Sequence, residues 1–290
     1  MTEPQIMNER GRLISLGYRL LGSLADAEDV VQETYARWYA LTERQRSEID
    51  SPGAWLMKVA GRVCLDQLRS ARARRERYVG EWIPEPLPEG TGDAHADPAD
   101  RVTLDESLNM AFLVVLDAMT SAERVAFILH DVYRYPFAEV AEIVGRTPAA
   151  CRQLATSARR RIRESRAPAV PVARRAAVVR DLKRAWEAQD IGALIAVLDP
   201  DVRAVADGGG LATALPEPIE GAELVARHLI RIAAGQPPGV TLLERTVSGQ
   251  PGLVMRKDGA VVTVIAFDVA GDRISRIWAV RNPEKLRAWE

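Results

Sequence analysis

Residues 120–166 read TSAERVAFILHDVYRYPFAEVAEIVGRTPAACRQLATSARRRIRESR, and this stretch decides the fold of the segment around it. It opens with a capping box, in which Thr120 and Glu123 can satisfy the first amides of a helix. Apolar residues then recur at the spacing of one buried helical face. They are Val125, Ile128, Leu129 and Val132. The start of the stretch therefore predicts a supporting helix.

Two further helices are expected after Pro136. A short one runs from Ala138 to Val144, and Gly145 should end it because glycine adopts the left-handed backbone at little cost. Thr147 can cap the next helix and Pro148 suits its first position. That helix divides into an apolar stripe, Cys151, Leu154, Ala155, Ala158 and Ile162, and a polar face, Arg152, Gln153, Thr156, Arg159, Arg160 and Arg163.

This division suits a helix that recognises nucleic acid, since its inner face must pack while its outer face meets base edges and phosphates. A solvated basic helix in an ordinary bundle would explain the arginines alone. The glycine turn, the Thr-Pro start and the preceding helix together favour a helix-turn-helix.

The composition of the whole chain predicts two or three domains, because 290 residues are many for one. The net charge is −1, but the charges are segregated. Arginines crowd residues 69–77 and 152–180, and acids crowd residues 26–33 and 81–100. The polar start has no apolar signal core, and no apolar run is long enough to span a bilayer. We therefore expect a cytoplasmic protein without a membrane partner.

Cysteine and histidine usage gives no sign of metal binding. Cys64 and Cys151 lie on apolar helical faces far apart in sequence, so buried free thiols in a reducing cytoplasm are expected rather than a disulfide. His95, His130 and His228 have no metal-ligand spacing. Neither a metal site nor a cofactor is predicted.

The N-terminal part predicts a helix over residues 6–21, ended by Gly22, and a second helix capped by Ser23. The buried stripe of the second helix is Ala27, Val30, Val31, Thr34 and Trp38. Its exposed face carries Asp26, Glu28, Asp29, Gln32 and Glu33. An acidic face suits a protein partner better than DNA. Complementing the helix dipole is an alternative for Asp26 and Glu28, and a weaker one for Gln32 and Glu33.

A polar segment, residues 42–50, is expected to be a loop before Ser51-Pro52 restarts a helix. The apolar residues of this helix are Trp55, Leu56, Val59, Val63 and Leu68, and its basic residues are Lys58, Arg62, Arg69, Arg72, Arg74 and Arg75. Aromatic rings among basic residues fit single-stranded DNA, in which bases stack and phosphates meet arginine. Trp55 taken alone is more often a core residue.

Two of these segments resemble the extracytoplasmic-function sigma factors. Residues 18–23 (YRLLGS) and 26–34 (DAEDVVQET) are similar to their conserved region two, and residues 137–163 are similar to their region four. The resemblance covers roughly residues 6–165. It implies that the acidic helix docks on the clamp of RNA polymerase. One residue departs from the family pattern, because Ser157 stands where a basic residue is usual.

The same resemblance implies how promoter DNA is bound. The loop after the acidic helix, together with the helix that follows, would melt and hold the minus-ten element, with Trp55, Lys58, Arg62, Arg69 and Arg72 as contacts. The helix over residues 148–163 would read the minus-thirty-five element in the major groove. Its expected contacts are Thr147, Ala149, Arg152, Gln153, Thr156 and Arg160, and Arg159 and Arg160 could compensate for Ser157.

Residues 81–100 are rich in proline, glycine and acid, which predicts a linker. Trp82 and Ile83 are costly to leave in water and imply a docking surface. Residues 82–86 (WIPEP) resemble the linker motif of the sigma factors that carry a fused SnoaL-like domain, often called SigJ-like. The first helix of the next module is expected to contain Leu104, Leu108, Phe112, Val115 and Met119.

The residues after Pro168 and Pro171 predict an α+β domain. Its first helix carries Val178, Leu182, Ala185 and Trp186, and two more are expected over residues 191–198 and 222–232. Strands follow over residues 241–247, 253–256, 261–269 and 274–280, with turns at Pro251-Gly252, Asp258-Gly259 and Gly271-Asp272. Residues 186–190 (WEAQD), with Asp207 before three glycines, resemble the SnoaL or NTF2-like cone, which can enclose a pocket.

Asp207 has two interpretations. It could be the general base of an enzyme in the cone, or its carboxylate could cap amides of a tight glycine turn. We favour the turn, because no His, Tyr or second carboxylate is marked as its partner. Residues 207–210 (DGGG) and 282–286 (NPEKL) also resemble motifs of the SigJ-like subgroup. The regulatory contacts that the three motifs imply are Trp82, Pro84, Asp207, Gly208, Asn282, Pro283, Lys285 and Leu286.

We therefore predict a multidomain protein with two all-α modules and an α+β NTF2-like cone. The expected domains are residues 1–80 (region two), 81–100 (linker), 101–167 (region four) and 172–290 (cone). The predicted function is that of a non-enzymatic sigma subunit regulated in cis by the cone. Its partners would be core RNA polymerase, promoter DNA and, in the cone, a small-molecule ligand. The alternatives are an autonomous helix-turn-helix regulator with a ligand-sensing cone and a bifunctional enzyme acting through Asp207.

Overall fold

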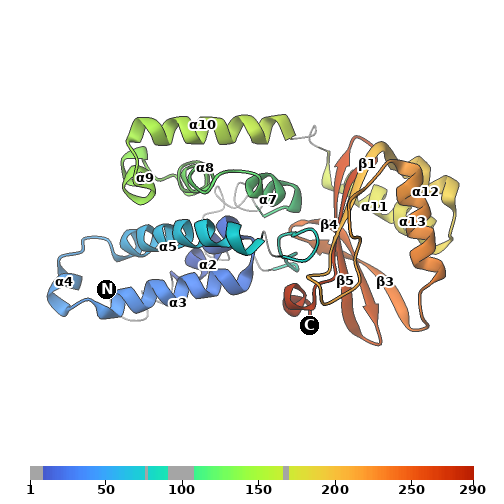
Figure 1. Ribbon diagram of the computed structural model, residues 1–290, viewed down its shortest axis with the longest axis horizontal. Helices are drawn as coiled ribbons and strands as arrows, with labels where there is room; N and C mark the ends of the chain where they lie inside the picture. The colour runs from blue at the N-terminus through green and yellow to red at the C-terminus, as the bar shows by residue number, and fades with distance from the viewer. Residues whose placement is uncertain (1–8, 76–77, 91–107, 166–169) are drawn as a thin grey trace. The chain divides into compact units, whose positions relative to one another are not determined.

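The computed structural model describes residues 9–75, 78–90, 108–165 and 170–290 (Figure 1), without the side chains of residues 71–75. The described residues fall into two compact units. The helical unit contains residues 9–75, Leu108 and residues 112–165. The cone unit contains residues 78–90, 109–111 and 170–290, so the start of the predicted linker is grouped with the C-terminal domain.

The first part of the helical unit consists of α2 (Arg10–Leu21), α3 (Leu24–Ala40), α4 (Glu43–Ser47) and α5 (Pro52–Arg75). Gly22 ends α2 with a φ of 73°, as expected, and the Ser23 hydroxyl accepts the Asp26 amide at 3.3 Å to cap α3. The predicted stripe of α3 is buried throughout. Ile6, placed in the first helix by the sequence, lies outside the described residues.

The loop expected over residues 42–50 is wrong, because α4 forms there. The Thr42 side chain accepts the amide of Gln45, and the Gln45 side chain accepts the amide of Thr42. This reciprocal capping box stabilises a helix of a single turn. The helix was not predicted because its residues are polar.

The second part of the helical unit contains α8 (Ser121–Phe127), a π-helical turn η1 (Ile128–Val132), α9 (Phe137–Val144) and α10 (Pro148–Ser165). The capping box at Thr120 and Glu123 is present, and Gly145 ends α9 with a φ of 71°. The Thr147 hydroxyl accepts the Ala150 amide at 3.2 Å. The predicted helix-turn-helix is thereby confirmed at each of its caps.

The helix before it, α7 (Met110–Asp117), is shorter than expected. Leu108 and Met119 lie outside it, and Leu104 is not among the described residues. Its fully buried residues are Met110, Leu113 and Leu116, whereas Phe112 and Val115 are only half-buried. The buried residues of α7 differ from the predicted ones because nearly every residue of this helix is apolar. Such a helix shows no apolar repeat from which its buried face can be predicted.

A buried arginine joins the two parts of the helical unit. Arg124 of α8 is 4% exposed, and it donates to the Leu20 carbonyl at the end of α2 (2.9 Å) and to Asp117 Oδ1 (2.8 Å). Burial lowers the pKa of Arg124 to about 10, so the guanidinium stays charged at neutral pH. Arg19 of α2 likewise donates to the Tyr133 hydroxyl at 3.2 Å.

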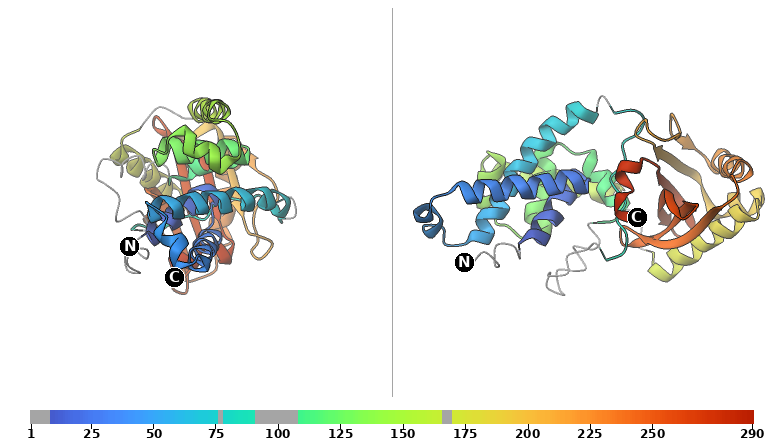
Figure 2. Two further views of the ribbon diagram at one scale, coloured as in Figure 1. Left: turned by 90° about the vertical axis from the view of Figure 1, so that its left-hand side faces the viewer. Right: turned by 90° about the horizontal axis from the view of Figure 1, so that it is seen from below.

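The cone unit packs three helices, α11 (Val172–Glu187), α12 (Ile191–Val197) and α13 (Ala222–Ala234), against a curved six-stranded sheet (Figures 1 and 2). The strands are β1 (Leu198–Asp207), β2 (Ile219–Glu220), β3 (Val240–Val247), β4 (Gln250–Lys257), β5 (Ala260–Ala270) and β6 (Arg273–Val280). Their order is β2-β1-β6-β5-β4-β3, with β1 and β6 parallel and the other pairs antiparallel. This is the expected α+β cone.

The sheet differs from the sequence predictions in its first two strands, neither of which was predicted, and in its first hairpin turn. The strand β1 was not predicted, because Asp199, Pro200 and Asp201 at its start disfavour strand formation locally. The first hairpin turn is at Ser248-Gly249 rather than at Pro251-Gly252. Ser248 and Gly249 both have positive φ (47° and 73°), as a two-residue hairpin turn requires. Pro251 instead pairs with Thr246 inside the hairpin.

The core of the cone unit includes the predicted stripe of α11, and the Trp186 indole donates to the Leu229 carbonyl at 2.7 Å. Cys64 and Cys151 are both buried and free, as expected. Within the described ranges, no helix has the length and apolar character needed to cross a membrane.

Candidate nucleic-acid interface and linker clamp

The outer face of α10 presents the predicted minus-thirty-five contacts to solvent. Thr147, Ala149, Arg152, Gln153, Thr156 and Arg160 are all exposed. Cys151, Ala155 and Ala158 are buried on the opposite side, so packing fixes which face is presented. The helix therefore has the two faces that a recognition helix needs.

Arg152 is held by an aromatic ring at the start of α9. Its guanidinium carbon lies 5.5 Å from the centre of the Phe137 ring, and Phe137 itself stacks on His130 with ring centres 3.7 Å apart. The His130 ring also contacts the Tyr135 carbonyl at 2.8 Å. A cation over a ring is stabilised without losing its outward donors, so Arg152 is oriented for contact beyond the protein.

Arg159 has a different position from the other arginines of α10. It forms two hydrogen bonds with the Asp131 carboxylate, at 2.7 and 3.1 Å, which join α10 to η1. Ser157 also faces inward, because its hydroxyl donates to Glu123 Oε1 at 2.7 Å. Of the two arginines expected to compensate for Ser157, Arg160 is exposed and Arg159 is half-buried.

Two predicted minus-ten contacts on α5 are bound to α9 in this structure. Lys58 forms an ion pair with the Glu142 carboxylate, and Arg62 donates to the Glu142 carbonyl at 3.2 Å. The two helices approach closely, since a Cβ added at Gly61 would lie 3.2 Å from Ile143. Hydrogen bonding to Lys58 lowers the pKa of the Glu142 carboxyl.

Trp55 and Arg69, two further predicted minus-ten residues, make contacts of their own. Trp55 is half-buried and packs edge-on against Trp38, with ring centres 5.2 Å apart. It therefore serves the core at least in part, as the alternative interpretation held. Arg69 is exposed beside Asp66 at 3.4 Å, and the side chain of Arg72 lies outside the described residues.

The acidic face of α3 is accessible as the sequence predicted. Glu28, Asp29, Gln32 and Glu33 are exposed, and Asp26 is half-buried in the first turn. Glu28 pairs with Arg10 at 3.4 Å and Glu33 with Arg37 at 2.8 Å. Both pairs are open to solvent, which leaves the face available to a larger partner.

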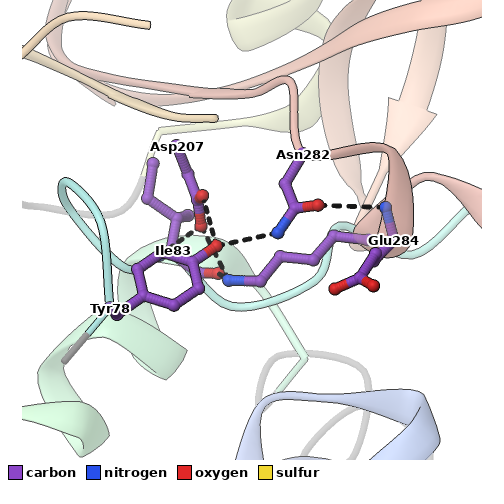
Figure 3. A network of polar contacts seen from close by, with 6 residues as sticks. Tyr78, Ile83, Asp207, Asn282 and Glu284 are labelled. Atoms are coloured by element: carbon purple, nitrogen blue, oxygen red, sulfur yellow. Dashed lines mark hydrogen bonds and ion pairs between the residues drawn. The ribbon is translucent and has the colours of Figure 1, made fainter. Parts of the chain in front are cut away.

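In the cone unit, Asp207, Asn282 and Lys285 form one network with Tyr78 and Ile83, which we call the linker clamp (Figure 3). Its centre is Asp207, at the end of β1, whose side chain is fully buried. Asp207 Oδ1 accepts the Tyr78 hydroxyl at 2.6 Å, and Oδ2 accepts the Ile83 amide at 3.0 Å. The carboxylate thus binds the linker rather than capping its own glycine turn.

Lys285 completes the charge balance of the clamp. Its ammonium donates to Asp207 Oδ2 at 2.7 Å and to the Ile83 carbonyl at 2.5 Å. It also lies 4.2 Å from the ring centre of Trp82 and 5.0 Å from that of Tyr78. Because the ion pair is buried and its hydrogen bonds are satisfied, the clamp has a defined geometry.

The glycine and NPEKL motifs shape the walls of the clamp. The Asn282 amide donates to the Tyr78 hydroxyl at 2.8 Å and its oxygen caps the short helix η2 (Pro283–Lys285). A Cβ at Gly209 would lie 2.2 Å from Asn282, and one at Gly208 would lie 2.0 Å from the Ala212 carbonyl, so neither position accommodates a side chain. The remaining predicted contacts Pro84 and Leu286 are buried, and Pro283 is exposed.

A second set of contacts holds the other end of the linker. Leu87 and Ser248 are joined by two hydrogen bonds, at 2.7 and 3.0 Å, and Pro88 forms a β-bridge with Val247. The Trp289 indole donates to the Pro86 carbonyl at 2.7 Å. Tyr78 and Ser248 were not predicted, because isolated polar residues of these types carry no local signal of a distant partner.

The cone also encloses a cavity of about 530 Å³, whose lining residues do not include Asp207. The Asp207 carboxylate contacts Tyr78, Ile83 and Lys285 instead. Among the described residues, no three His, Cys, Asp or Glu side chains are grouped as a metal site would need.

Comparison with known proteins agrees with this organisation. The family Sigma-70 region 2 matches residues 6–74, and Sigma-70, region 4 matches residues 109–162. The chain is 36% identical to the ECF RNA polymerase sigma factor SigJ of Mycobacterium tuberculosis (strain ATCC 25618 / H37Rv), over 96% of this chain and 90% of SigJ. The chain belongs to the ECF RNA polymerase sigma factors.

The likeness of this sigma factor to its relatives extends through the C-terminal cone. It is 34% identical to the probable ECF RNA polymerase sigma factor SigI of M. tuberculosis (strain ATCC 25618 / H37Rv), over 96% of this chain and 92% of SigI. The crystal structure of M. tuberculosis SigJ matches with a TM-score of 0.75 and 31% identity, covering 99% of both chains. The predicted fold class, two helical sigma regions followed by an NTF2-like cone, is confirmed.

Proposed function

We propose that this sigma factor gives core RNA polymerase its promoter choice and that the cone regulates it in cis through the linker clamp. The observation that carries the regulatory part is the buried Asp207–Lys285 pair, which binds the linker at Ile83. Burying an ion pair costs desolvation energy. Because this pair contacts the backbone of the Pro-rich linker, we infer that its role is to hold the linker in one place.

The acidic face of α3 is proposed to dock on polymerase. It is supported by the exposure of Asp29, Gln32 and Glu33 and by membership in a family named for RNA polymerase. Reversing Asp29 and Glu33 to lysine should abolish association with core polymerase in a pull-down. Because surface changes usually alter stability little, the fold should persist. Retained association would contradict the assignment of this face.

Promoter DNA is proposed to be bound at two places. The helix α5 would hold the minus-ten element through Lys58, Arg62 and Arg69, and α10 would read the minus-thirty-five element through Arg152 and Gln153. The two elements lie about two turns of DNA apart, each roughly 34 Å long. A linker fixed to the cone over residues 78–88 has fewer residues left for spanning that distance, so the clamp can control promoter recognition.

The role proposed for the cone is binding and regulation rather than catalysis. Asp207 is fully buried and occupied by Tyr78, Ile83 and Lys285. A general base needs access to its substrate proton. The same contacts give Asp207 a structural role in the clamp.

Run-off transcription with reconstituted polymerase tests the regulatory proposal. The promoter template would come from selection of random duplexes bound by the holoenzyme. Trp82→Ala, Asp207→Ala, deletion from Asn282 onward and truncation at Ala173 should each change promoter-dependent transcription while polymerase binding persists. We expect an increase, because the complete cone holds the linker in one arrangement.

A matched control is Arg174→Ala, which removes an exposed pair with Asp272 on the same unit. It should leave transcription unchanged. Wild-type transcription from all four clamp variants would show that the cone does not regulate the sigma regions.

A further inference from the structure

The cavity of the cone has a mostly apolar wall. It lies between α11, α13 and the strands β1, β4, β5 and β6, and its volume is about 530 Å³. Large apolar side chains line it, among them Leu182, Trp186, Leu229, Ile265, Phe267 and Ile277. Small-molecule sites in proteins are concave, mostly apolar and of 300–1,000 Å³, so the cavity has the size and character of such a site.

The ionisable side chains that line the cavity are all basic. His228 and Arg231 come from α13, Lys257 from the end of β4, and Arg281 from the residue after β6. No aspartate or glutamate is among the lining residues. Within the described parts of the chain, Arg231, Lys257 and Arg281 form no ion pair with a carboxylate, and Arg281 donates instead to the Thr213 carbonyl. A cationic set without a protein counter-charge is complementary to an anion.

We propose that this cavity binds an apolar small molecule that carries one anionic group, such as a long-chain carboxylic acid. The apolar body of the ligand would pack against the wall formed by α11 and the sheet. Its anionic group would contact the basic residues of α13 and β4. The proposed ligand class does not depend on the sigma-factor function, and binding assays without transcription test it.

The residues present favour binding over chemical conversion. Burial, with a smaller contribution from Arg231, lowers the pKa of His228, and no carboxylate lines the cavity to act with it. An acid–base pair of the kind that hydrolases and isomerases use is therefore not assembled by the lining residues.

Isothermal titration of the full-length protein with palmitate and with hexadecan-1-ol tests the proposal. These probes share a sixteen-carbon chain and differ in the anionic group. Both should bind, and palmitate should bind more tightly. Equal affinities would overturn the anion assignment, and absence of binding by either probe would overturn the cavity as a site for this class.

Variants of the basic residues locate the anion. Because Arg231 and Lys257 are exposed, the double change Arg231→Gln and Lys257→Gln should weaken palmitate binding only about three- to tenfold and leave hexadecan-1-ol binding unchanged. The control Arg227→Gln lies one turn earlier on α13 and outside the cavity lining. Ala279→Phe, which fills the cavity, should weaken both probes in a variant whose circular dichroism is unchanged. Unaltered palmitate affinity in both the double variant and Ala279→Phe would place the ligand elsewhere.

Discussion

Lys285 and Asp207 are the residues on which the clamp depends most directly, since both are nearly inaccessible to solvent. Lys285→Met retains an unbranched side chain of similar length but leaves the Asp207 carboxylate buried without its cation. Removing one partner of a buried pair typically costs about 3–5 kcal/mol. Each kcal/mol lowers a melting temperature by about 2–4 °C in a domain of 150–250 residues. We expect a corresponding fall in the thermal unfolding temperature of the cone unit, measured by calorimetry.

The control for Lys285→Met is Arg174→Met, since Arg174 pairs with Asp272 at 2.6 Å on the surface of the same unit. An exposed pair contributes little, so this variant should melt like the wild type. Replacing both clamp residues, as Asp207→Asn with Lys285→Met, should recover part of the loss because no buried charge remains unpaired. Equal melting temperatures for Lys285→Met and Arg174→Met would contradict the clamp.

Tyr78 gives the clamp a pH dependence. Burial, together with the hydrogen bond to Asp207, raises the pKa of Tyr78 well above its usual value. At pH above about 10 an unfolded tyrosine loses its proton while the folded one retains it. The folded state then binds more protons, so stability is complete below pH 10 and falls as the pH rises through the folded pKa.

The measurement for Tyr78 is urea unfolding between pH 8 and pH 11. The wild type should lose stability above pH 10 more steeply than Tyr78→Phe, which lacks the titrating hydroxyl. Tyr39→Phe, at a position that is 44% exposed, is the matched control and should retain the wild-type slope. Parallel curves for all three proteins would exclude Tyr78 as the source.

Some residues of the clamp could be predicted from the sequence and others could not. The docking of Trp82 and Ile83 was predictable, because apolar groups in a polar linker must be covered by something. In the structure Lys285 contacts both of them, with its ammonium 4.2 Å from the ring centre of Trp82 and hydrogen-bonded to the Ile83 carbonyl. The dependence of Asp207 on Tyr78 was not predictable, since 129 positions separate them and neither residue type is unusual locally.

At the scale of elements, we propose that α10 separates base recognition from phosphate binding. Arg152 lies in the second turn of the helix and is oriented by Phe137, whereas Arg160 is two turns further on. Arg152→Ala should cost roughly 1–3 kcal/mol and relax sequence preference, while Arg160→Ala should weaken all sequences alike. Competitive binding of holoenzyme to a library of minus-thirty-five sequences measures both. Equal loss of specificity in the two variants would refute the division.

The packing of α5 on α9 makes a second prediction at this scale. Glu142 binds both Lys58 and Arg62, which are proposed DNA contacts. Glu142→Ala should therefore strengthen binding of the free protein to single-stranded DNA severalfold, measured by fluorescence anisotropy. Glu139→Ala, on the same helix and without a cation partner among the described residues, should have no effect. If Glu142→Ala leaves the affinity unchanged, the contact does not compete with DNA.

Elements were predicted correctly where local signals agree with tertiary structure. The helix-turn-helix has a capping box, a glycine stop and a Thr-Pro start, and all three are present. The strand β1 was missed because it is specified by its partner: it pairs in parallel with β6, which is separated from it by most of the domain. Local residue propensity does not report pairing with a distant strand, so β1 could not be predicted from its own residues.

At the scale of the cone unit, the cavity and the clamp are built on the same two strands. Ala204 and Ala206 of β1 line the cavity, and the next residue, Asp207, anchors the linker. Ala279 and Arg281 line it at the end of β6, and the next residue, Asn282, contacts Tyr78. A ligand that orders these strands would therefore also order the clamp, at a smaller entropic cost for the second event.

The coupling is reciprocal, because a ligand that stabilises the clamp must be bound more tightly when the clamp is formed. We therefore expect palmitate to bind Lys285→Met less tightly than the wild type, although Lys285 does not line the cavity. If the clamp restrains promoter recognition, saturating palmitate should also lower run-off transcription by the full chain and leave a protein truncated at Ala173 unaffected. The titration measures the coupling and the transcription assay measures its consequence. Equal palmitate affinity for the wild type and Lys285→Met would show that the cavity and the clamp act independently, whatever the transcription assay gives.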